Sequence, residues 1–80
     1  MKRQFNSSEI EVIDFDDATS GEHVIEFRDP DRLPSESILA ISLPNGGRWE
    51  DATLSVSPRQ GDIQVSFALW AINVAKERLA

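Results

Sequence analysis

Apolar and polar side chains alternate over several short stretches of this 80-residue chain. Ile10 and Val12, for example, stand between acidic neighbours, and a period of two places successive side chains on opposite faces of a β-strand. Alternation of this kind predicts four strands, over residues 9–15, 22–28, 38–43 and 49–57. Short polar connections separate most of them, so we expect neighbouring strands to pair in antiparallel fashion. At Ile13 and Phe15 the apolar positions change parity, which predicts either a bulge or a strand end buried on both faces.

Two of the connections carry clear turn signals. Residues 16–21 have the sequence Asp-Asp-Ala-Thr-Ser-Gly, which is typical of a turn. Residues 44–47, Pro-Asn-Gly-Gly, give the strongest signal in the chain, because Asn and Gly tolerate the positive φ angles that tight hairpin turns require. Both segments therefore favour hairpins between successive strands.

The C-terminal stretch fits two patterns. Ile63, Val65 and Phe67 alternate with polar residues, as in a fifth strand, and the first two are β-branched. Ile63, Phe67 and Val74 also follow helical spacing. We favour a strand to about Phe67 and a helix from Ala68 onward, with an earlier start of the helix as the alternative.

These elements predict an α+β fold, a small antiparallel β-meander of about five strands packed on its apolar face by one C-terminal helix. Because 80 residues are few for two domains, we expect a single domain over residues 1–80. Residues 1–8 either join this domain or form a flexible N-terminal tail. A chain of this length buries only about 60% of its unfolded surface, which limits its stability unless it forms oligomers.

Negative charge is concentrated near the start of the chain. The net charge is −6, and residues 1–27 hold seven acidic residues against two basic ones. Nucleic acids and anionic membrane surfaces require a basic footprint, so we expect neither as a direct partner. The expected partner is a protein with a basic surface, which includes nucleic-acid-binding proteins. The alternative is that the acidic surface serves solubility alone.

The lack of cysteine and of a long apolar segment bears on the cellular compartment in which we expect the protein. The chain has no cysteine, which excludes disulfides, thiolate metal sites and cysteine nucleophiles and favours a reducing cytoplasm. The residues that follow Lys2 and Arg3 are polar apart from Phe5, unlike the apolar core of a signal peptide. The longest apolar stretch, residues 67–75, is far shorter than the ~20 residues that span a bilayer. We therefore expect a soluble cytoplasmic protein.

Candidate catalytic and metal-binding residues are few. His23 is the only histidine, and we expect it to pack, partly buried, on the apolar face of its strand. No serine stands in the strand–turn–helix elbow that marks a nucleophile. The carboxylates clustered in residues 14–22 match no calcium-loop spacing. We therefore expect no catalytic residue, no cofactor and no metal ion, and no enzymatic activity.

The remaining candidates are surface residues that could bind a partner. Arg and Trp are the types most enriched at interface hot spots, and Arg48 adjoins Trp49 at a strand end, although Trp49 fits the edge of the core equally well. The candidate partner-binding residues are Glu9, Glu11, Asp16, Asp17, Glu22, Glu26, Arg48 and Trp49. We expect a non-catalytic acidic binding protein of the inhibitor, immunity-protein, antitoxin or phage anti-defence (anti-CRISPR-like) type. The alternative is a structural or assembly subunit that forms a homodimer or larger homo-oligomer through a sheet edge.

Overall fold

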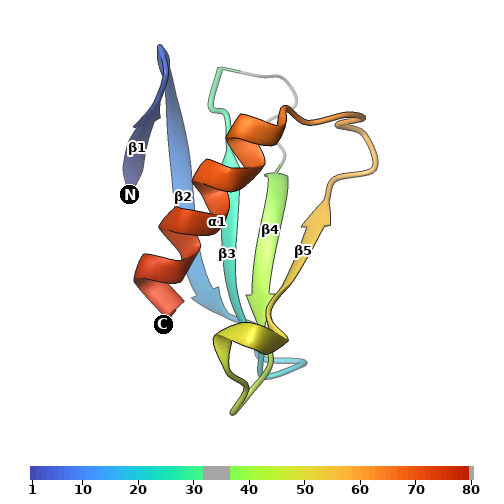
Figure 1. Cartoon of the computed structure of the whole chain (residues 1–80). Helices are drawn as coiled ribbons and strands as arrows, with labels where there is room; N and C mark the ends of the chain where they lie inside the picture. The colour runs from blue at the N-terminus through green and yellow to red at the C-terminus, as the bar shows by residue number, and fades with distance from the viewer. Residues whose placement is uncertain (32–36, 80) are drawn as a thin grey trace.

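Five strands form one antiparallel sheet in the order in which they follow along the chain, β1-β2-β3-β4-β5 (Figure 1). The computed structural model describes residues 1–31 and 37–79. The strands are β1 (Lys2–Phe5), β2 (Ser8–Asp16), β3 (His23–Arg28), β4 (Ser37–Leu43) and β5 (Thr53–Val56). A short 3-10 helix, η1 (Trp49–Asp51), precedes β5, and the α-helix α1 (Val65–Leu79) follows it. The α+β meander with a C-terminal helix predicted from the sequence is confirmed.

The helix α1 crosses one face of the sheet diagonally, from the upper end of β4 towards β2 and β1 (Figure 1). Its buried residues follow one another at intervals of four, three and one, so they form one side of the helix: Phe67, Ala71, Val74 and Ala75. They belong to one core with alternate residues of the three central strands: Ile10, Val12, Ile25, Phe27, Leu39 and Ile41. We call this side of the sheet the helix face. The other side, which no element of residues 1–31 or 37–79 covers, is the uncovered face (Figure 1).

The strand β1 is an element that the sequence pattern did not indicate. It pairs with β2 as far as the pair Phe5↔Ser8. The ring centroid of Phe5 lies 5.2 Å from those of both Phe67 and Trp70 on α1. Lys2–Phe5 therefore belongs to the sheet, and a flexible tail is the wrong expectation for these residues. Only Phe5 in this strand is apolar, which is why the alternation of side chains did not reveal it.

The chain after β5 forms a helix where a further strand was favoured. α1 begins at Val65, so the strand predicted over residues 63–67 is wrong and the helical alternative is confirmed. Phe67 and Ala71 are four residues apart and both are buried against the sheet, whereas Val65 is 74% exposed. Burial of one side of the helix thus outweighs the β-propensity of the two β-branched residues. Within the described residues, no helix combines the length and apolar character that crossing a membrane requires.

The end of β2 and the start of β5 also differ from the expected strands. The register of β2 with β3 is regular as far as the pair Asp16↔His23, so the parity change at Ile13 and Phe15 reflects no bulge. Ile13 and Phe15 lie on the uncovered face, and the acidic residues that alternate with them, Asp14 and Asp16, lie on the helix face. The strand predicted over residues 49–57 is shorter, because its first part forms η1.

Candidate functional site

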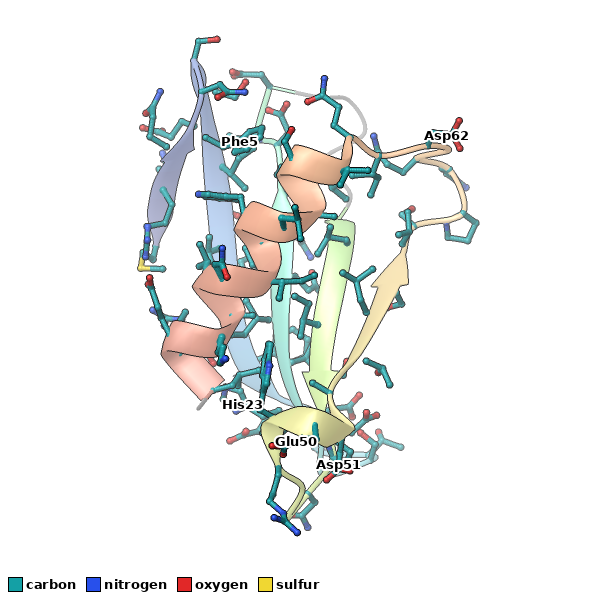
Figure 2. The ribbon with its side chains drawn as sticks, viewed as in Figure 1. Phe5, His23, Glu50, Asp51 and Asp62 are labelled. Atoms are coloured by element: carbon teal, nitrogen blue, oxygen red, sulfur yellow. The ribbon has the colours of Figure 1, made fainter. Side chains whose placement is uncertain are left out.

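Two connections lie side by side at one end of the sheet, the β2–β3 turn (residues 17–22) and the segment from β4 to β5 (residues 44–52) (Figure 1). They touch where Gly21 approaches Asn45, since a Cβ atom on Gly21 would lie 3.4 Å from the Cβ of Asn45. Five acidic residues of these connections and the adjoining strand end form what we call the acidic end: Asp16, Asp17, Glu22, Glu50 and Asp51. Figure 2 shows Glu50, Asp51 and His23 at this end of the molecule. Arg48 is the one basic residue of the two connections.

Two carboxylates of the acidic end shape its backbone. Asp17 accepts hydrogen bonds at Oδ1 from the backbone amides of Thr19 (2.8 Å) and Ser20 (3.3 Å), which closes the β2–β3 turn. Asp51 accepts a hydrogen bond at Oδ2 from the backbone amide of Arg48 (2.9 Å) at the start of η1. These residues hold the two connections in place as well as adding charge.

Two other carboxylates of the acidic end are not engaged in this way. The side chains of Glu22 and Glu50 make no hydrogen bond or ion pair with any residue in the described parts of the chain. Glu50 is exposed and Glu22 is half-buried. Their charges are therefore available to an outside partner without the loss of an internal contact.

His23 binds carboxylates with both nitrogens of its ring. Nδ1 lies 2.6 Å from Oδ1 of Asp16, and Nε2 contacts Oδ1 of Asp14. The second oxygen of Asp14 accepts hydrogen bonds from Nε (2.9 Å) and Nη2 (2.8 Å) of Arg78, near the end of α1. The resulting chain of four side chains links β2 and β3 to the helix on the helix face.

The two carboxylates also set the charge of His23. The hydrogen bond to Asp16, with the negative charge and hydrogen bond of Asp14, raises the pKa of His23 above its ordinary value of 6.5, against a smaller opposing effect of desolvation. The imidazolium can donate to Asp14 and Asp16 at the same time, which a neutral ring cannot do. His23 thus links two carboxylates within the fold and is partly exposed at its strand end, rather than being the apolar packing residue that its position in the sequence predicted.

The described residues offer no arrangement of ligands for a metal ion. Over residues 1–31 and 37–79, no group of three or more His, Asp or Glu side chains is placed to hold a cation. A hollow of about 400 Å³ on the β4–β5 side carries three serine hydroxyls and one carboxylate. That carboxylate, Glu26, is bound at Oε2 by Nε (3.1 Å) and Nη2 (2.8 Å) of Arg28. It is therefore engaged in an ion pair within the fold.

The remaining acidic candidates lie apart from the acidic end. Glu9, Glu11 and Glu26 share the uncovered face, as the register with β1 and β3 shows. There they alternate with bases: Lys2 Nζ lies 3.5 Å from Oε1 of Glu9, and Arg28 is opposite Glu11 as well as bonded to Glu26. The structure therefore divides the acidic candidates into two groups, one mixed in charge and one almost purely negative.

Trp49 joins the acidic end to an apolar hollow. A shallow hollow of about 170 Å³ opens between η1, β5 and α1, lined by Ile41, Trp49, Ala52, Thr53, Leu54 and Ile72. Trp49 is half-buried and packs against the core, while the neighbouring Arg48 is exposed. Trp49 thus combines contact with the core and access to the surface, the two roles that its sequence position left open.

Glu50 and Asp51 are site residues that the sequence did not single out. They follow Arg48 and Trp49, and residues 28–80 nearly balance their charges with seven acidic residues against six basic ones, so no local excess of negative charge marks Glu50 and Asp51. Only the meeting of Gly21 with Asn45 brings them beside Asp16, Asp17 and Glu22.

The chain was compared with protein-family models, with curated proteins and with solved structures, and none of the three comparisons found a match. What this chain does must therefore be inferred from its own side chains and their arrangement.

Proposed function

We propose that this chain is a non-catalytic protein-binding domain that docks its acidic end on a basic surface of another protein. The observation that carries the proposal is the convergence of five carboxylates from two segments distant in the sequence, beside only two basic residues of the described parts of the chain, Arg48 and His23. The acids of the uncovered face, by contrast, stand beside Lys2 and Arg28. The two connections hold this concentration of charge in place through the hydrogen bonds of Asp17 and Asp51.

The arrangement suits fast association with a positively charged surface. A concentrated negative potential attracts a basic partner over the Debye length, about 8 Å at physiological ionic strength, and raises the association rate. Glu22 and Glu50 make no ion pair with any residue of 1–31 or 37–79 that binding would have to break. The hollow beside Trp49 adds apolar contact next to the charge, as interface hot spots combine the two.

A domain of this kind acts by occupying a surface that its partner needs for something else. Inhibitors, immunity proteins, antitoxins and phage anti-defence proteins work in this way, and a cytoplasmic protein with a nucleic-acid-binding surface is the partner class that fits the charge best.

The test compares two charge-reversed variants that change the net charge equally. Glu22→Lys with Glu50→Lys alters the acidic end, and Glu9→Lys with Glu11→Lys alters the uncovered face. Immobilised wild type and both variants are used as baits in a host lysate, and captured proteins are identified by mass spectrometry. Association rates of the captured protein are then measured at increasing salt concentration.

We expect a basic protein that the wild type and the uncovered-face variant retain and the acidic-end variant loses. Its association rate should fall by about tenfold or more in the acidic-end variant at low salt, and the difference should shrink as salt is added. Equal capture by all three baits, or rates that do not depend on Glu22 and Glu50, would contradict the proposal. Far-UV circular dichroism of each variant verifies that it is folded.

A further inference from the structure

The two edges of the sheet differ in how they are protected. An edge strand exposes unpaired backbone groups, and charged residues on it, lysine above all, discourage pairing with another chain. β1 carries Lys2 and Arg3, whereas β5, with the sequence Thr-Leu-Ser-Val, has no charge at all. Among the strands of residues 1–31 and 37–79 none pairs with the outer side of β5, so this edge is the one open to a partner strand.

The hydrogen-bond pattern shows which backbone groups of β5 face outward. The amide of Ser57 donates to the carbonyl of Ile38 (3.1 Å), and the register pairs Ala40 with Ser55. In an antiparallel ladder, hydrogen-bonded and non-hydrogen-bonded pairs alternate, so Ser55 and Ser57 direct their amide and carbonyl groups towards β4. Leu54 and Val56 consequently direct theirs away from the sheet.

The side chains beside this edge form an uncovered apolar strip. Leu54 and Val56 lie on the helix face but are 40% and 41% exposed, because α1 covers the central strands rather than β5. Ile72 of α1 lines the hollow beside Leu54 and does not cover it. Two of the six large exposed apolar side chains in the described residues, Leu54 and Val56, thus lie at the open edge.

We propose that a second copy of this chain pairs with β5, strand against strand, about a two-fold axis at Ser55. In this register Leu54 of each copy lies opposite Val56 of the other copy. All four outward-facing groups of each strand then pair, which gives four backbone hydrogen bonds between the copies. The two sheets become one, both helices lie on the same face, and the two apolar strips meet between them.

The edge strand is complementary to itself, which favours a second copy as the occupant. β5 carries no charge, so two copies can pair along it without opposing like charges. The two-fold register sets the exposed apolar side chains Leu54 and Val56 of one copy against Val56 and Leu54 of the other, which buries apolar surface of both copies. Figure 2 shows Asp51 and Asp62, the nearest acidic residues before and after β5, at opposite ends of the molecule and outside the paired strand.

The edge is also limited in length, so the pairing closes at two copies. Pro58 has no amide proton to continue the outward ladder, and η1 ends it on the other side of β5. An isologous two-fold contact uses the open edge of both copies and leaves the charged β1 edges outside. The proposal is independent of the proposed function, because the acidic end does not take part in the pairing.

A cysteine cross-link tests the register directly. At the proposed axis the two Ser55 residues form a non-hydrogen-bonded pair with Cα atoms about 4.5 Å apart, within the disulfide range of about 4.4–6.8 Å. Thr53 would instead lie about 13 Å from its counterpart, at about 3.3 Å per residue. The chain has no native cysteine, so Ser55→Cys and Thr53→Cys are a matched pair on the same strand and the same face.

We expect Ser55→Cys to form a covalent dimer with diamide as the oxidant at least about tenfold faster than Thr53→Cys, given the difference in distance. Equal rates, or faster cross-linking of Thr53→Cys, would refute the register. Both variants replace an exposed side chain and should fold as the wild type does.

Sedimentation equilibrium of the cysteine-free protein tests the dimer itself. The mass should rise from 8.9 kDa towards twice that value as the concentration increases. Leu54→Lys, which places a charge on the open edge, should weaken dimerisation at least about tenfold, while Phe15→Lys on the uncovered face should not. A protein that stays monomeric up to about millimolar concentration, the range of very weak association, refutes the proposal. Oligomers larger than two, or a dimer lost only in Phe15→Lys, refute it as well.

Discussion

Replacing Phe27 by alanine should destabilise the protein far more than the same change at Phe15. Phe27 is fully buried on the helix face, and its ring centroid lies 5.8 Å from that of Trp70 on α1. Phe15 is 38% exposed on the uncovered face. The two residues belong to adjacent strands, so the comparison isolates the effect of covering by the helix.

The magnitudes follow from burial. Truncation of a fully buried Phe costs about 3–5 kcal/mol, because transfer free energy is lost and a cavity remains. For Phe15 no closed cavity forms and part of the ring is already in water, so we expect a loss of about 1 kcal/mol. A domain of this size has a free energy of unfolding of about 4–12 kcal/mol, at about 0.05–0.15 kcal/mol per residue. Phe27→Ala is therefore close to the limit of folding, and Phe27→Leu, with an expected loss of about 1–2 kcal/mol, provides a milder variant.

The assay is urea unfolding followed by far-UV circular dichroism at low protein concentration. The slope of the free energy of unfolding against urea should stay the same in all variants, so that the change in midpoint reports stability. Equal losses at Phe15 and Phe27, or a larger loss at Phe15, would show that the two faces are not covered as described. The placement of α1 on the helix face would then have to be abandoned.

Three further changes test particular contacts. The raised pKa of His23 stabilises the fold fully below about pH 6.5, and this contribution is lost as the pH rises through the folded-state pKa, so the advantage of the wild type over His23→Gln in urea unfolding should shrink as the pH is raised above about 6.5. A constant difference would contradict the role of the two carboxylates. Arg78→Lys, which loses the two-nitrogen contact with Asp14, should cost about 1 kcal/mol at low salt and less at high salt in the same assay. Asn6 has a φ of 51° in the β1–β2 turn, so Asn6→Ala should cost about 1 kcal/mol and Asn6→Gly should not, and equal melting temperatures for the two would argue against this backbone conformation.

The fold class could be predicted because the central strands carry their signal locally. In β3 and β4 the residues of the helix face alternate with the others, and Gly46 takes the positive φ of 73° that its turn sequence indicates. β1 could not be predicted, because its side chains are mainly polar and its place depends on Phe5 contacting α1. The start of α1 was ambiguous for a similar reason, since the burial of Phe67 decides between two patterns that fit the same residues.

The candidate site could be predicted only in part. Asp16, Asp17 and Glu22 are neighbours in the sequence and stay together in the fold. Glu50 and Asp51 join them through contact between two turns, which no local pattern encodes. The separation of Glu9, Glu11 and Glu26 from this group likewise depends on which face each strand presents after pairing.

The meander order of the sheet has a consequence for how fast the chain folds. Each strand pairs only with its neighbours along the chain, so every ladder closes a short loop. Folding rates of small domains rise as contacts become more local, and a sheet of successive hairpins is among the more local β arrangements. The docking of α1 is different, because residues such as Arg78 meet Asp14 across most of the chain length. We therefore expect the hairpins to form before the helix docks, so that substitutions on the buried side of α1 mainly speed unfolding and leave the folding rate almost unchanged.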